Sequence, residues 1–251
     1  MGLFDRSPSK LSGKTTLLLT SDPGGALLDA ARLYDPGVRP WRGRLVFRNG
    51  VLLFGPVTLT PELEQQAELP AGMAVAYYAE AALQRHRERR SLEAKQRDCD
   101  RLVRGLADRF GGTVKYAGAP PDLALVTSVY SEQAVAPDQV IEVLRPYGGD
   151  FRIEDQDQDT YSLSGKGTYF YVAYWSPRLY LEFDVPPAVR ATGSRPLHHW
   201  DLHPGSGRKH IAPELARRVG EGALALAGRS GGVALDELRF PFSSADDLLR
   251  R

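Results

Sequence analysis

The chain has a single cysteine, almost no net charge and no long apolar run. Cys99 is the only cysteine among 251 residues, so no intramolecular disulfide can form, which is typical of a reducing compartment. The formal net charge of +1 gives no long-range field that would concentrate nucleic acid or an anionic membrane. The apolar runs Leu17–Leu19 and Val51–Phe54 are far shorter than the ~20 residues that cross a bilayer. These features predict a cytoplasmic protein without a membrane partner.

Turn and helix signals divide the sequence into two parts. In the N-terminal part, Asn49-Gly50 lies between two strand-like runs and is typical of a tight type I′ hairpin. From about Met73 to Phe110 there is no proline, and apolar residues recur with helical spacing in the second half of this stretch. Cys99 falls on this apolar stripe, which favours a packing role over a nucleophilic one. Residues 85–101 are charged on most faces, and we interpret them as a solvated helix that forms the hinge between the two parts.

The C-terminal part is rich in strand signals. Four strand-like runs, FRIEDQ, TYSLS, TYFYVAYW and RLYLEFDV, follow a helix that Pro137 opens. We therefore predict an α+β fold, with a mixed or antiparallel sheet and helices packed on one face. The predicted division is a smaller N-terminal α/β unit, 1–97, with the hairpin and the charged helix, and a C-terminal domain, 98–251, with an aromatic-rich meander. One continuous domain is the alternative.

One internal echo suggests a repeated unit. Leu106–Gly112 (LADRFGG) and Leu226–Gly232 (LAGRSGG) match at five of seven positions, and each ends a helix that leads into a strand. Glycine at these places is typical of a helix C-cap, because it adopts the left-handed conformation without a steric penalty. The same C-cap explains why Gly228–Gly232 fits the G-x-S-x-G pattern without the strand-to-helix context of a hydrolase. The echo predicts a possible duplicated α/β unit in the C-terminal part.

Acidic and aromatic residues concentrate in the C-terminal strands. Residues 150–184 hold seven acids and three bases. Along one strand, alternate carboxylates point to the same face, and aromatic rings that alternate with core positions point away from the core. The candidate partner-binding residues are Asp155, Asp157, Asp159, Tyr169, Tyr171 and Trp175.

Exposed tyrosine and tryptophan beside carboxylates are typical of a protein-binding surface. The leading hypothesis is therefore a non-catalytic interaction protein, similar in kind to an immunity or inhibitor protein, that docks a basic protein partner and needs no cofactor. One alternative is that the carboxylates only keep an edge strand hydrated and prevent its aggregation. The other is that a helix covers the aromatic rings.

Four of the five histidines lie between positions 198 and 210, in a segment that we interpret as a loop. In an extended segment His199, Asp201 and His203 point the same way, and His210 could add a fourth ligand. Two imidazoles and a carboxylate can hold a divalent transition metal, which could activate water. A metal-dependent hydrolase is therefore the second hypothesis. The alternative is that these histidines only form hydrogen bonds or face water.

The third hypothesis is nucleic-acid binding through the basic run Arg85–Arg90. Seven bases and four acids lie between Arg85 and Arg101, so the run is diluted by opposite charge. Pairs such as Glu93 and Arg97 stand four residues apart, as on a solvated helix. A nucleic-acid-binding face requires a denser basic surface, which makes nucleic acid the less favoured partner.

Overall fold

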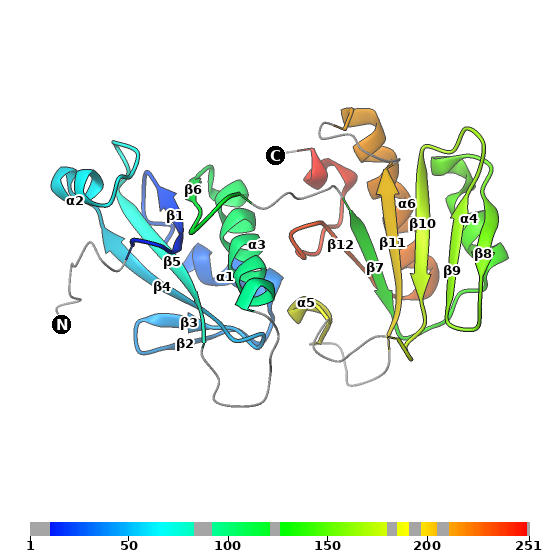
Figure 1. The fold of residues 1–251 in the computed structure, drawn as a ribbon, viewed down its shortest axis with the longest axis horizontal. Coiled ribbons are helices and arrows are strands. Elements are labelled where there is room, and N and C mark those ends of the chain that lie inside the picture. The colour runs from blue at the N-terminus through cyan, green and yellow to red at the C-terminus, as the bar shows by residue number, and fades with distance from the viewer. Residues whose placement is uncertain are drawn as a thin grey trace. The chain divides into compact units, whose positions relative to one another are not determined.

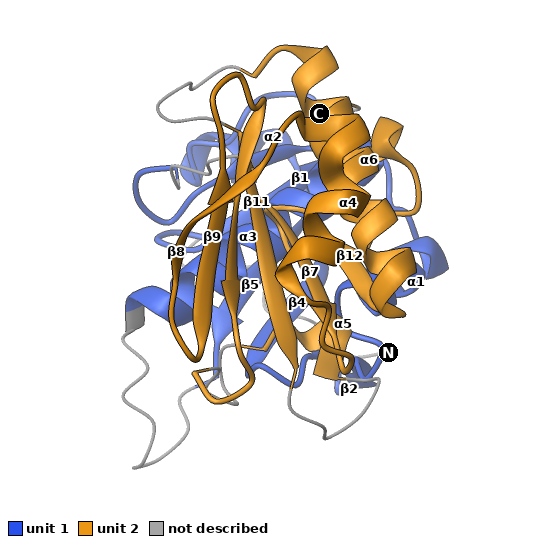
Figure 2. Ribbon diagram, turned by 90° about the vertical axis from the view of Figure 1, so that its right-hand side faces the viewer, with its two compact units in different colours: residues 1–122 blue, residues 123–251 orange. Residues whose placement is uncertain are grey.

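The computed structural model describes residues 11–82, 92–120, 126–179, 185–190, 197–204 and 211–249 (Figure 1). The chain divides into two compact units, residues 1–122 and 123–251, each with its own six-stranded sheet (Figure 2). All strand pairs described are antiparallel. The α+β fold with antiparallel sheets is therefore confirmed.

The first unit has the strand order β2-β3-β4-β5-β1-β6. Its elements are β1 (Thr15–Leu19), α1 (Gly25–Tyr34), β2 (Arg39–Trp41), β3 (Arg44–Val46), β4 (Val51–Thr58), α2 (Pro61–Gln66), β5 (Val75–Ala81), α3 (Leu92–Phe110) and β6 (Thr113–Lys115). Helix α2 begins after Thr60, whose side chain accepts a hydrogen bond from the Leu63 amide. It packs on one face of the sheet against Leu18 and Tyr78.

The hairpin between β3 and β4 is present, with a different turn from the one expected. The Phe47 amide donates to the Val51 carbonyl, and the Gly50 amide donates to the Phe47 carbonyl. Gly50 has a positive φ of 83°, whereas Asn49 is not among the residues with positive φ. The loop is therefore three residues long, with glycine in the left-handed position that closes such hairpins.

Helix α3 belongs to the first unit. Its apolar stripe is fully buried at Cys99, Leu102, Val103 and Leu106, as the spacing predicted. The helix packs against β1 and β5 and leads directly into β6. The predicted division after residue 97 falls inside this helix, whereas the two units divide after Asp122. The helix stays with the first unit because its buried face packs there.

The second unit has the strand order β12-β7-β11-β10-β9-β8. Its elements are β7 (Thr127–Ser131), α4 (Pro137–Gly148), β8 (Arg152–Gln156), β9 (Thr160–Ser164), β10 (Phe170–Trp175), α5 (Pro187–Arg190), β11 (His198–Pro204), α6 (Pro213–Ser230), β12 (Val233–Leu235) and the 3-10 helix η3 (Ala245–Leu248). Figure 2 shows α4 and α6 along one face of this sheet. Leu144 and Leu226 from these helices pack there against Phe170 and Trp200.

The two units repeat one topology. Numbered within its own unit, each sheet has the order 2-3-4-5-1-6, with long helices after the first and fifth strands and a short helix between the fourth and fifth. The echoed segments end α3 and α6 at Gly111 and Gly231, which have positive φ values of 63° and 64°. The echo therefore marks the same place in both units, and the repeat extends over the chain rather than the C-terminal part alone.

Two expected elements differ from the structure. The segment interpreted as a histidine-rich loop is β11, an interior strand between β7 and β10. Trp200 and Leu202 point into the core from this strand, which explains its place in the sheet. The fourth expected strand, at 178–185, lies mainly outside the described residues. In the described part of the chain, every helix is too short or too polar to cross a membrane.

Candidate functional site

Two of the three histidines of β11, His199 and His203, lie on the sheet face opposite α4 and α6, whereas His198 lies beside Tyr174 and Trp200 on the helix side. His199, Asp201 and His203 alternate with the buried Trp200 and Leu202, so the three polar side chains share one face as predicted. The Nε2 atom of His199 is 2.7 Å from Oδ1 of Asp201, and Nε2 of His203 is 3.9 Å from Oδ2. Strand β11 thus places two imidazoles around one carboxylate.

Asp201 is the charged centre of this face. Ser128 on β7 donates a hydrogen bond of 2.5 Å to the same oxygen that His199 contacts. Burial acts to raise the pKa of the Asp201 carboxyl, but the hydrogen bonds from His199 and Ser128, together with the charge interactions with His199 and His203, outweigh it and lower that pKa below its ordinary value. Asp201 is therefore an anion at neutral pH. Serine and histidine both contact the carboxylate, so the imidazole does not stand between nucleophile and acid as in a catalytic triad.

The metal hypothesis gains no support from the described residues. No group of three or more histidine, cysteine, aspartate or glutamate side chains among them has an arrangement that could hold a metal ion. Within the predicted set, one imidazole nitrogen of His199 is already engaged with Asp201. His210 lies outside the described residues, and so does the basic run Arg85–Arg90 of the nucleic-acid hypothesis.

Two aromatic stacks flank Asp201 on the same face. Tyr171 on β10 stacks on His203, with ring centroids 4.5 Å apart and planes 2° from parallel. His199 stacks between Trp175, at 5.0 Å, and Tyr130, at 4.4 Å. Small side chains lie between the two stacks, because Ala173 pairs with Asp201 on one side and with Ser162 on the other. We call this surface the cation face; it consists of the two stacks and a central row of Asp201, Ala173 and Ser162 between them.

The structure brings together only some of the predicted partner-binding residues. Asp155 pairs with Ser162 and extends the central row of the cation face. Strand β8 ends at Gln156, so the three aspartates do not share one strand face as expected. Asp157 instead accepts hydrogen bonds from the backbone amides of Asp159 and Thr160 in the β8–β9 turn. Asp159 accepts one from the hydroxyl of Ser176.

Tyr169 also lies away from the cation face. It precedes β10, and the guanidinium of Arg218 on α6 lies 4.6 Å from the centre of its ring. Tyr169 is 50% exposed and Tyr171 is 38% exposed, so both rings are accessible to solvent, although Arg218 of α6 contacts that of Tyr169. The short helix α5 packs on the far end of the sheet, where Ala188 and Val189 contact Tyr130.

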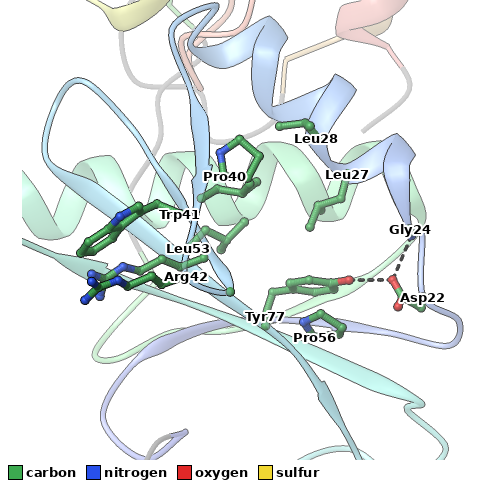
Figure 3. Close-up of a pocket in the computed structure, with 14 residues that line it drawn as sticks. Asp22, Gly24, Leu27, Leu28, Pro40, Trp41, Arg42, Leu53, Pro56 and Tyr77 are labelled. Atoms are coloured by element: carbon green, nitrogen blue, oxygen red, sulfur yellow. Dashed lines mark hydrogen bonds between the residues drawn. The ribbon is translucent and has the colours of Figure 1, made fainter. Parts of the chain in front are cut away.

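A pocket in the first unit was not predicted from the sequence. It has a volume of about 460 Å³, within the range of small-molecule sites (Figure 3). Leu27 and Leu28 of α1 form one wall, and Leu53 and Tyr77 of β4 and β5 lie across from them. The residues that line it come from four separate stretches of the chain, 22–28, 40–45, 53–56 and Tyr77, which no local sequence motif connects.

The two ends of the pocket differ in charge. At one end Tyr77 donates a hydrogen bond of 2.6 Å to Asp22, which also accepts the Gly24 amide at 2.9 Å (Figure 3). At the other end are Trp41, Arg42 and Arg44 of the β2–β3 hairpin. The hydrogen bonds from Tyr77 and Gly24 lower the pKa of Asp22, so the carboxylate is charged at neutral pH.

No family model, curated protein or solved structure matches this chain. The two places whose geometry suggests a function are the cation face and the pocket. The cation face could be anticipated in part, because alternation places His199, Asp201 and His203 together. The pocket could not, since it forms only where α1 crosses strands β2 to β5.

Proposed function

We propose that the chain is a non-catalytic binding protein that docks a basic protein partner on the cation face of its second unit. The ligand on that face is a cationic side chain, arginine or lysine, presented by the partner. The observation that carries the proposal is the carboxylate of Asp201 between two stacks of aromatic rings. Ring faces and carboxylates both attract cations.

The shape of the cation face supports a side-chain ligand. Ala173 and Ser162 are small, so the central row between the stacks presents little bulk to an incoming group. Asp201 and Asp155 mark two places along this row, which suits a segment that carries more than one positive charge. Burial lowers the pKa of His203, so its ring is neutral at pH 7 and does not repel a cation.

The charge of the second unit agrees with a basic partner. Residues 123–251 contain 17 acids and 14 bases, whereas residues 1–122 contain 14 acids and 18 bases. The acidic balance is modest, and it steers a basic partner toward this unit rather than the first. Aromatic stacking then supplies the contact area, because rigid rings bury surface at small entropic cost.

The experiment is a calorimetric titration with a nine-residue oligoarginine peptide. Tyr171→Ser removes one ring of the cation face, and we expect binding about fivefold weaker, the loss typical of one exposed cation–π contact. Tyr169→Ser is the matched control, because Tyr169 is also an exposed tyrosine but lies outside the cation face. Equal affinities of the two variants would exclude the cation face as the docking surface.

A further inference from the structure

Because the two units share one topology, the pocket of the first unit can be compared with the equivalent volume of the second unit, which side chains fill. Leu53 on β4 and Val172 on β10 occupy equivalent positions, since each lies on the fourth strand of its unit. Each also faces a leucine of the third strand, Leu45 in one unit and Leu163 in the other. Residues counted from these pairs can therefore be compared between the units.

The comparison places two glycines where the second unit has two tyrosines. Gly55 stands two residues after Leu53, as Tyr174 stands two after Val172. Gly43 stands two residues before Leu45, as Tyr161 stands two before Leu163. Tyr161 and Tyr174 stack on each other with centroids 4.4 Å apart. Both glycines line the pocket, so the first unit has an empty volume where its repeat holds two stacked rings.

The backbone keeps the Gly55 position free of a side chain. Gly55 has a positive φ of 136°, and a Cβ atom there would lie 2.5 Å from the ring of Tyr77. No substitution at this position can fill the volume from β4 without moving Tyr77. The backbone conformation between Leu53 and Pro56 therefore keeps this part of the pocket free of side chains.

The arginines at the pocket mouth lack an acidic partner in the described part of the chain. Arg42 and Arg44 lie over the ring of Trp41, at 4.8 and 4.3 Å from its centre, and neither forms an ion pair there. The buried Nε atom of Arg44 has no hydrogen-bond partner among the residues that the structure describes. A buried donor without a partner is costly, and an anion at this end would satisfy it.

The hairpin that presents these arginines contains a strained residue. Arg42 and Gly43 form the two-residue turn between β2 and β3 and have φ values of 47° and 76°. Glycine or asparagine is the usual residue at the first of these positions, because a positive φ is unfavourable for an arginine. Backbone strain of this kind clusters at ligand-binding sites, and here it accompanies a guanidinium that lines the pocket.

We infer that the pocket of the first unit binds a small aromatic organic anion. Its ring system lies between α1 and β4, in the volume that corresponds to the stacked tyrosines of the second unit. Its anionic group pairs with Arg42 and Arg44. At the opposite end, Oδ2 of Asp22 accepts a hydrogen bond from an amine or hydroxyl of the same ligand, since only Oδ1 has partners among the described residues. This site is independent of the cation face.

Two fluorescent probes that differ in one group test the inference. The first is 8-anilinonaphthalene-1-sulfonate, and the second is N-phenyl-1-naphthylamine, which has the same rings without the sulfonate. We expect Arg44→Gln and Arg42→Asn each to weaken binding of the sulfonate about tenfold, the loss typical of a charge-assisted hydrogen bond. Binding of the neutral probe is expected to stay unchanged.

Arg32→Gln is the control, because Arg32 is exposed on α1, pairs with Asp29 and does not line the pocket. Arg42→Asn also separates binding from folding, since asparagine tolerates the positive φ and the melting temperature is not expected to fall. The inference is overturned if the sulfonate binds the two pocket variants as tightly as Arg32→Gln. An equal loss of both probes in these variants, at an unchanged melting temperature, would overturn it as well.

Discussion

Tyr77 and Trp200 occupy equivalent positions in the two units but have different surroundings. Each lies on the fifth strand of its sheet, opposite Leu17 in one unit and Val129 in the other. Trp200 is fully buried, and its indole donates a hydrogen bond to the hydroxyl of Tyr161. Tyr77 instead directs its hydroxyl to Asp22 at the pocket. The aromatic residue at this position thus completes a core in one unit and lines the pocket in the other.

At the residue scale, Tyr77→Phe is expected to raise the pKa of Asp22 toward its ordinary value. The hydrogen bond from Tyr77 is the largest cause of the lowered pKa. A lowered carboxyl pKa stabilises the fold above the unfolded-state pKa, and this stability is lost as pH falls through the folded-state pKa, below about 4. The variant should therefore lose less stability between pH 5 and pH 2. An NMR titration of the Asp22 carboxyl measures the change, and an unaltered pKa would contradict it.

Among the elements, β11 was hardest to predict. Its polar residues and flanking prolines are typical of a loop, and its apolar content is only Trp200 and Leu202. Those two residues decide the structure, because they fill the core between α4 and α6. The polar residues fit the same strand because its other face is not covered by these helices. Sequence alone identified the shared direction of His199 and Asp201 but not the sheet around them.

At the element scale, the bond between Trp200 and Tyr161 should couple β11 to β9 across β10. The distance is 2.7 Å and both residues are buried. We expect Trp200→Phe and Tyr161→Phe each to lower the free energy of unfolding, and the pair to show a coupling of about 1 kcal/mol, the typical value for a hydrogen bond. Denaturant unfolding of the four proteins in a double-mutant cycle provides the measurement. Additive effects would show that the bond contributes nothing.

For the whole molecule, the predictions from sequence that succeeded are those that depend on local patterns. The α+β class, the hairpin at Gly50 and the buried stripe of α3 depend on local patterns, and each is present. The echo at Leu106 and Leu226 was a true sign of repetition, but seven residues could not show how far it extends. The pocket was not predictable, because it depends on Gly43 and Gly55, whose role is seen only when they are compared with Tyr161 and Tyr174 at the equivalent positions of the second unit.

The direct test of the proposed function is the binding of oligoarginine by residues 123–251 produced alone. This unit has its own core, so we expect it to fold, whereas a division after residue 97 cuts α3 and should leave the N-terminal piece unfolded. We expect the isolated second unit to bind the peptide as tightly as the full chain, and Tyr171→Ser to weaken this binding about fivefold. A folded second unit that does not bind the peptide would contradict the proposed function.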